Sequence, residues 1–410
     1  MRGACESERG ALQDKKGADE RANTVPRRTA RVKTIYCEFG LIGKELAFEE
    51  NVYISFSKNG FIKDVSHTPP GGVNEEYVSC LVMPGLVNAH THVGDSFFKE
   101  VGYNYSIDEL VAPPHGLKHN LLDSVPEREI KEGIKWAAVE MLSSGTTTFA
   151  DFREGGVRGA LILRRALEDV PIKCLILGRD HTNIGDLLKV CDGVGLPSTV
   201  PYSDEELRMV YEECKLREAI ISVHASETVD ERERSLRMHG VTDVVRAVNI
   251  LNADLLVHLT HVSDEELSLV SGRGVACCPR ANAYLGVGIP PVEKMVEAGV
   301  KVCLGTDNVM INSPDLFREM DFLGKVVRAR SGVRALSAKS ILKMVTVNPA
   351  EVLKLNSGWI ERGRAADIVI IDLEAPNVKP VHHPYQALVH RVKSENVVSV
   401  YVNGVKVHEK

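Results

Sequence analysis

The middle of the chain alternates short apolar runs with longer amphipathic stretches. The apolar runs have the length of buried strands, whereas residues 127–145 carry apolar side chains three and four positions apart, which is the spacing of one helix face. This alternation is typical of parallel strands joined by helical crossovers. The runs that qualify as strands are residues 81–93, 145–152, 172–178, 192–196, 219–225, 254–259, 274–279 and 300–307. The pattern therefore predicts an α/β fold built on a (β/α)8 TIM-like barrel.

Both flanks of this region are β-like. Residues 31–81 hold short runs rich in β-branched and aromatic residues, separated by turn signals such as the Pro-Pro-Gly-Gly of residues 69–72. Residues 366–373 and 397–407 have the same character near the C-terminus. Residues 1–30 are instead charged and lack apolar periodicity. We expect them to form a disordered tail, because they bury too little surface to offset the entropy of ordering.

Composition and charge narrow the class of protein. The hydrophobic fraction of 44% and the charged fraction of 26% are ordinary for a soluble globular protein. The net charge of -6 is spread along the chain and gives no basic field for nucleic acid. No apolar run approaches the roughly 20 residues that span a bilayer. Nine cysteines, an odd number without a CxxC pair, indicate reduced core thiols. We expect a cytoplasmic protein that binds neither nucleic acid nor membranes.

Candidate metal ligands coincide with the ends of the predicted strands. This set consists of His90, His92, His224, His258 and Asp307. In a barrel the carboxyl ends of the strands form the catalytic face. Residues two apart on a strand point to the same side, so His90 and His92 can direct both imidazoles to one ion. Such a pair alone is more often a core or solvated pair, but the three further strand-end ligands favour a metal site.

The sequences around these residues carry a family resemblance. The segments are PGLVNAHTHV (84–93), SVHASET (222–228), LVHLTHV (256–262), CPRANAYLGVG (278–288) and LGTDN (304–308). They resemble the amidohydrolase superfamily, and the likeness is greatest to its branch of cytosine, guanine and adenosine-derivative deaminases and triazine hydrolases. Residues 363–373 resemble the family's return to a small β-sandwich. The resemblance implies that residues 31–81 and 358–410 form one composite β-sandwich domain beside a barrel domain of residues 82–357.

The resemblance also implies one divalent metal ion. By position, His90, His92, His224 and Asp307 would hold it, with water in the open coordination position. Zinc is the expected metal, with iron as the alternative. Binuclear relatives place a carbamylated lysine at the end of the fourth strand, and residues 192–199 contain no lysine. A mononuclear site is therefore expected.

Catalytic roles follow from the same resemblance. A bound ion lowers the pKa of its water toward about 7. Asp307 would accept the water proton, and Glu227 would shuttle protons between the water and a ring nitrogen of the substrate. His258 would hydrogen-bond the attacking hydroxide or the developing oxyanion. His261, three residues later, competes for this role, but the match of VHL to the family's strand end favours His258.

Substrate contacts are expected from the loops after the strands. Arg179, and Arg280 with Asn282, would meet an anionic or carbonyl-bearing group, although surface salt bridges are the alternative interpretation. Asp151 would accept a hydrogen bond from the substrate or orient a neighbouring ligand. The loop of residues 112–122 lacks the longer insertion, often with a tryptophan, of many nucleoside-type deaminases. Its His115 and His119 would either overhang the pocket or face solvent.

These observations predict an enzyme that hydrolyses C–N bonds other than peptide bonds. The leading hypothesis is hydrolytic deamination of an aminated heterocycle such as a purine, pyrimidine, pterin or nucleoside derivative. Opening of a cyclic amide or imidazolone, or dechlorination of a triazine, would use the same site. A non-catalytic scaffold is the remaining hypothesis. The expected partners are the small heterocyclic substrate and water, and the resemblance also suggests a homo-oligomer.

Overall fold

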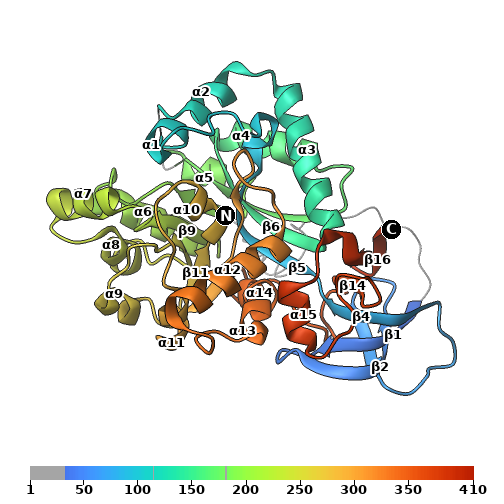
Figure 1. Ribbon diagram of the computed structural model, residues 1–410. Helices are drawn as coiled ribbons and strands as arrows, with labels where there is room; N and C mark the ends of the chain where they lie inside the picture. The colour runs from blue at the N-terminus through green and yellow to red at the C-terminus, as the bar shows by residue number, and fades with distance from the viewer. Residues whose placement is uncertain (1–32, 114, 181) are drawn as a thin grey trace, which may run out of the picture.

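The computed structural model describes residues 33–113, 115–180 and 182–410. The predicted tail of residues 1–30 lies outside the described residues. Two sheets organise the described chain: a parallel sheet enclosed by helices, and a smaller sheet that lies beside it at the lower right of Figure 1. Among the described helices, none combines the length and the apolar character needed to cross a bilayer.

The parallel sheet is a closed barrel. Its strands are β5 (Leu86–His92), β6 (Thr146–Arg153), β7 (Lys173–Gly178), β8 (Gly193–Leu196), β9 (Ile220–Ala225), β10 (Leu255–His258), β11 (Gly274–Cys277), β12 (Lys301–Leu304) and β13 (Asp307–Asn308). They follow one another around the sheet in chain order, except that β13 pairs with β5. Since β12 pairs with β11 and β13 pairs with β5, the single segment 301–308 joins the last strand to the first. The predicted (β/α)8 barrel is confirmed.

The predicted strand 81–93 is divided in the structure. Residues 81–84 end β4 (Glu75–Pro84) of the smaller sheet, and β5 starts the barrel after Gly85. A Cβ at Gly85 would lie 2.3 Å from Oγ1 of Thr147. Only glycine therefore fits where the chain passes between the two sheets. The sequence showed one apolar run because both strands are buried.

Helices surround the barrel and connect its strands. The longer ones are α3 (Glu127–Ser143), α4 (Gly156–Ala166), α6 (Asp204–Leu216), α7 (Val229–His239) and α12 (Leu316–Ser331). Two of these helices, α6 and α3, begin or end at capping signals that are visible in the sequence. In α6 the Ser203 side chain caps the helix and Glu206 completes a capping box, while α3 stops two residues before Gly145, which adopts φ +86°. Their apolar faces join the main core between barrel and helices.

Apolar side chains also fill the barrel interior. This inner cluster includes Ala89, Phe152, Leu177, Val257 and Ala276, all fully buried. Phe152 lies directly under the histidines, with its ring centroid 4.3 Å from that of His90. The barrel is therefore packed rather than hollow, and polar chemistry is confined to the carboxyl ends of its strands.

The smaller sheet combines both ends of the described chain. Its further strands are β1 (Lys33–Ile42), β2 (Ala47–Phe56), β3 (Ile62–Ser66), β14 (Ile368–Asp372), β15 (Val397–Val402) and β16 (Val405–Glu409). β4 pairs in parallel with β1 and antiparallel with β14, so the N-terminal and C-terminal strands share one sheet. This confirms the predicted composite sheet. The exact limits of the two domains stay a prediction.

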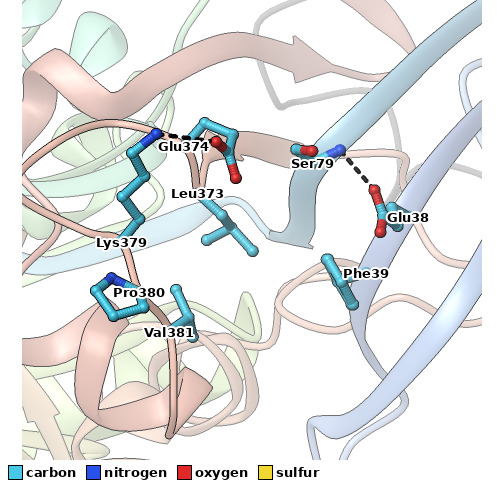
Figure 2. Close-up of a pocket in the computed structure, with 8 residues that line it drawn as sticks. All are labelled: Glu38, Phe39, Ser79, Leu373, Glu374, Lys379, Pro380 and Val381. Atoms are coloured by element: carbon cyan, nitrogen blue, oxygen red, sulfur yellow. Dashed lines mark hydrogen bonds and ion pairs between the residues drawn. The ribbon is translucent and has the colours of Figure 1, made fainter.

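Figure 2 shows a pocket on the smaller sheet. It is lined by Glu38, Phe39, Ser79, Leu373, Glu374, Lys379, Pro380 and Val381. Two of its polar groups already have partners, because Lys379 pairs with Glu374 at 3.1 Å and the Ser79 amide donates to Glu38 at 2.7 Å. None of the eight lining residues is a histidine or cysteine, and none belongs to the barrel strands. We therefore place the chemistry elsewhere, at the barrel rim.

Candidate metal centre

Five side chains far apart in the sequence meet at the carboxyl rim of the barrel. His90 and His92 come from the end of β5, His224 from β9, His258 from the end of β10 and Asp307 from the start of β13. All are nearly inaccessible to solvent. His258 and Asp307 adopt φ of +73° and +62°, in the left-handed region that non-glycine residues rarely occupy. Such strain persists only where the surrounding fold imposes it, and it is common at functional sites.

Several of the donor atoms lie within coordination reach of one another. Nε2 of His90 is 3.4 Å from Oδ1 of Asp307, and Nε2 of His92 is 3.6 Å from the same oxygen. Donor atoms of His90, His224 and His258 all lie within 4.8 Å of one another. Two ligands that each bind one ion at about 2.1 Å in tetrahedral geometry lie about 3.4 Å apart. The spacing therefore suits a shared cation better than direct hydrogen bonds.

Hydrogen bonds orient two of the imidazoles. Nδ1 of His224 lies 3.0 Å from the carbonyl oxygen of Leu196, at the end of β8. Nδ1 of His92 lies 3.1 Å from the carbonyl oxygen of Phe152 and 3.0 Å from Oε1 of Glu154. Each Nδ1–H can donate to these oxygens, which leaves Nε2 free for a metal ion.

His90 provides the clearest sign that a cation belongs here. Its side chain is fully buried, and neither ring nitrogen has a hydrogen-bond partner among the described residues. An unpaired buried polar group is costly, and such groups in proteins usually have a ligand. Burial lowers the pKa of His90 and, with the Lys118 charge, lowers the pKa of His92 to about 3, so both rings are neutral as metal ligands must be. The residues present fit a divalent metal ion.

Asp307 supplies the negative charge of this donor set. Burial alone would raise the pKa of Asp307, but the nearby imidazoles of His90, His258 and His92 hold it well below its usual range. The carboxylate is therefore ionised. Its charge also offsets part of the charge that a divalent ion would bring.

Glu227 and His258 lie beside the donor set. Nε2 of His258 is 3.5 Å from Oε2 of Glu227, whose side chain is 15% exposed. Nδ1 of His258 is 3.3 Å from Oδ1 of Asn282, and the Asn282 amide donates to Thr260 at 3.0 Å. Burial raises the pKa of Glu227, and the Asp307 charge adds to this while His258 opposes it. A carboxyl group whose pKa is raised in this way is suited to accept and release a proton.

The competing histidine lies outside this arrangement. Nε2 of His261 is 2.8 Å from the carbonyl oxygen of Val287. Among the two candidates on this loop, it is His258 that approaches the other histidines, with ring centroids 5.8 Å from His90 and 5.3 Å from His224.

Three of the residues expected to contact substrate are engaged within the protein. Asp151 accepts hydrogen bonds from the Thr91 hydroxyl at 3.1 Å and the Val93 amide at 2.6 Å, so it orients the chain around His92. Arg280 pairs with the fully buried Glu319 at 3.3 Å. Asn282 holds His258, as described above. Their roles toward a substrate stay predictions.

Arg179 remains available at the rim. Its side chain is 14% exposed, and it pairs weakly with Glu154, with Nη1 3.9 Å from Oε1. The buried Nε has no hydrogen-bond partner among the described residues.

Lys118 and Glu154 were not identified from the sequence. Lys118, on α2 (Leu117–Ser124), is 2% exposed and places Nζ 2.6 Å from Oε1 of Glu154. In the same loop, His115 is exposed and His119 is half-buried against the carbonyl oxygen of Val111. The loop thus contributes its lysine rather than its histidines to the site. The position of Glu154, directly after β6, was the one signal that could have revealed it.

A (β/α)8 barrel with buried histidines, an aspartate and a neighbouring glutamate at its carboxyl rim defines a metal-dependent hydrolase. The model of the amidohydrolase family matches residues 81–407, and the chain belongs to this family. Two curated relatives cover most of the chain. A putative aminohydrolase of Methanothermobacter thermautotrophicus is 36% identical, and the match covers 85% of this chain and 92% of the relative. A 5-methylthioadenosine/S-adenosylhomocysteine deaminase of Pyrococcus furiosus is 30% identical, and the match covers 90% of this chain and 91% of the relative.

Solved structures support the same fold. A zinc-bound adenosine deaminase from Xanthomonas campestris superposes with a TM-score of 0.81 at 22% identity, covering 91% of this chain and 92% of that one. The comparisons confirm the sequence-based prediction of a hydrolytic enzyme that acts on C–N bonds, within the deaminase class of the amidohydrolase family.

Proposed function

We propose that the protein catalyses hydrolytic deamination of an aminated heterocycle with one zinc ion held by His90, His92, His224 and Asp307. The observation that carries this proposal is the pair of buried, unpartnered ring nitrogens of His90 at the centre of the donor set. A bound zinc ion would supply a water molecule acidified toward a pKa of about 7. The end of the fourth strand offers the carbonyl of Leu196 rather than a lysine, which favours a mononuclear site.

The protons of the reaction can be handled by the residues present. Overall, water adds to the amine-bearing carbon, and the C–N bond breaks to release ammonia. Glu227 has the raised pKa and the partial exposure needed to take a proton and deliver it to a ring nitrogen or the leaving amine. His258, held by Asn282, directs Nε2 toward Glu227 and can hydrogen-bond the oxygen that forms at the attacked carbon. Asp307 would take part in the first proton transfer.

The named relatives support deamination. The Pyrococcus furiosus relative is a deaminase of adenosine derivatives, and the Xanthomonas campestris structure is an adenosine deaminase with bound zinc. Both reactions replace an exocyclic amine of a heterocycle by oxygen. We extend the reaction class, but not the particular substrate, to this chain. A cytoplasmic location and a homo-oligomeric state remain proposals.

The proposal is tested by metal analysis and by ammonia release over a panel of purines, pyrimidines, pterins and their nucleosides. We expect about one zinc ion per chain, ammonia from at least one panel member, and loss of that activity in Glu227→Gln with the zinc retained. A purified protein that binds zinc but releases ammonia from none of them would overturn the proposal. So would product analysis showing ring opening without ammonia.

A further inference from the structure

Charged side chains gather on one side of the metal centre, around Glu154. Oε1 of this carboxylate is 2.6 Å from Nζ of Lys118, 3.0 Å from Nδ1 of His92 and 3.9 Å from Nη1 of Arg179. One carboxylate thus lies among three cations, Lys118, Arg153 and Arg179, and also orients a metal ligand.

Two of these cations, Lys118 and Arg179, are not fully compensated. Lys118 is 2% exposed, and its recorded ion-pair partner among the described residues is Glu154. At 3.9 Å the pairing of Arg179 with the same oxygen is weak, and its buried Nε has no partner among the described residues. Burying an unpaired charge or donor is costly. A site retains such groups when its ligand brings the opposite charge.

Other charged groups nearby do not remove this excess. Arg153 adds a third cation 3.5 Å from Glu154, and the buried Asp151 offsets only part of its charge. Asp95 faces Lys118, yet its two oxygens accept hydrogen bonds from Asn308 and the Met310 amide. Burial raises the pKa of Asp95 to about 7, which weakens it as a counter-charge at neutral pH.

Both cations lie on the Glu154 side of the metal centre. The Lys118 charge acts on Glu227 as well as on His92, and the Arg179 charge acts on His90 and His224. Lys118 comes from α2, which lies with α1 (Ile107–Leu110) beside α3 and α4 at the top of Figure 1. Arg179 follows β7. Two elements from different parts of the chain therefore bring positive charge to one side of the rim.

We propose that the substrate is an anionic heterocycle, whose carboxylate or phosphate group is bound by Lys118 and Arg179. This inference rests on the proposed deaminase function and names its substrate class. The ammonium of Lys118 has donors beyond the one used on Glu154, and the Arg179 guanidinium can meet an oxyanion with two N–H groups. Glu154 holds both side chains in place before the substrate binds. A neutral base or nucleoside would leave the two cations sharing one carboxylate, as they do in the free enzyme.

The test compares matched neutral and anionic substrates on the zinc-loaded protein. Adenosine and adenosine 5′-monophosphate form the phosphate pair, and pterin and pterin-6-carboxylate form the carboxylate pair. We expect kcat/KM to be higher for the anionic member of at least one pair by about 10- to 100-fold, mainly through KM. The pair that shows the effect identifies the anion. Preference for the neutral member of both pairs would overturn the inference.

Variants test whether Lys118 and Arg179 cause the preference for the anionic substrate. Lys118→Met and Arg179→Met should each reduce the anionic-to-neutral ratio of kcat/KM about tenfold or more, and Lys118→Arg should restore part of it. Lys99→Met is the matched control, because this exposed lysine pairs with Glu140 on the outside of the protein. Zinc content and melting temperature are measured for every variant, so that a folding defect is recognised. An unchanged ratio in both methionine variants would overturn the inference.

Failure of this inference can be told apart from failure of the proposed function. Equal ammonia release from neutral and anionic substrates would leave deamination standing and overturn the anion site. If no panel member releases ammonia, the proposed function fails. Calorimetry with inorganic phosphate then tests the anion site on its own. Binding that is weakened at least tenfold in Lys118→Met at equal zinc content would support the anion site, and binding that is absent or unchanged would overturn it.

Discussion

Glu154 holds His92 through its ring Nδ1, with 3.0 Å between that nitrogen and Oε1. The opposite nitrogen of the same ring faces Asp307. Carboxylates in this position fix the orientation of a metal-binding imidazole and strengthen it as a ligand. Glu154 is thus a positioning residue for the metal centre as well as the partner of Lys118.

Loss of this carboxylate should weaken metal binding. We predict that Glu154→Ala lowers zinc affinity by about 10- to 100-fold, because the His92 ring loses its main constraint. Competition with a coloured chelator measures the affinity directly. Glu140→Ala, on the exposed side of α3, serves as the control and should retain the wild-type value. Equal affinities in the two variants would show that Glu154 does not position His92.

Asn282 should matter for turnover rather than for metal binding. Its Oδ1 accepts from Nδ1 of His258, which fixes the tautomer that points Nε2 at Glu227. We predict that Asn282→Ala lowers kcat by about 10- to 100-fold, with normal zinc content and a smaller change in KM. The exposed Asn356 provides the matched control as Asn356→Ala. A defect confined to KM would argue instead for a direct substrate contact.

Removal of the metal should affect both activity and stability. The buried nitrogens of His90 lose their ligand in the stripped protein, so we predict a lower melting temperature and no ammonia release after chelation. Added zinc should restore both. Calorimetric scans with and without zinc check the first effect, and an ammonia assay checks the second. Identical melting curves for the two forms would contradict the proposed ligand set.

Gly305 should tolerate no side chain. It lies between β12 and β13, and a Cβ there would come within 2.7 Å of Cβ and 2.8 Å of the carbonyl oxygen of His90. Gly305→Ala should therefore displace His90, weaken zinc binding and reduce the free energy of unfolding by about 1–3 kcal/mol. Gly71→Ala is the control, because an added Cβ meets nothing within 4 Å there. A metal titration and a urea denaturation of both variants test this prediction.

A separate prediction concerns the smaller sheet at low pH. Burial of Glu75 would raise its pKa, but hydrogen bonds from Lys33, Tyr401, Tyr77 and Lys406 outweigh it and lower the pKa from 4.5 to about 2. Because the folded value is depressed, the stabilisation is complete above pH 4.5 and is lost as the pH falls toward 2. Its size is on the order of 2 kcal/mol for this partly exposed group.

The measurement is the difference in unfolding free energy between the wild type and Glu75→Gln across this range. The difference should be constant from pH 7 to about 5 and should shrink between about 4.5 and 2. Glu76→Gln, on the neighbouring exposed residue, corrects for the general effect of acid. A difference that stays constant down to pH 2 would refute the role of Glu75.

The barrel and the gathering of histidines and an aspartate at its rim could be predicted because both follow from local pattern. Strand runs are visible as apolar segments, and His90, His224 and Asp307 occupy their ends. Contacts that depend on how loops fold could not be predicted. Lys118 meets Glu154 only because α2 returns over the rim. The sequence left Arg280 open between a substrate contact and a salt bridge, and the structure pairs it with Glu319, which lies 39 residues further along the chain.

The closure of the barrel by residues 301–308 also bears on how the protein matures. β5 is the first barrel strand to be synthesised, and the segment that pairs with it is the last. A growing chain therefore holds two imidazoles for a long interval before their carboxylate partner emerges from the ribosome. If Asp307 is the anionic ligand as proposed, full metal capture awaits completion of the ring, and a chain truncated before Asp307 would lack both its final seam and this carboxylate.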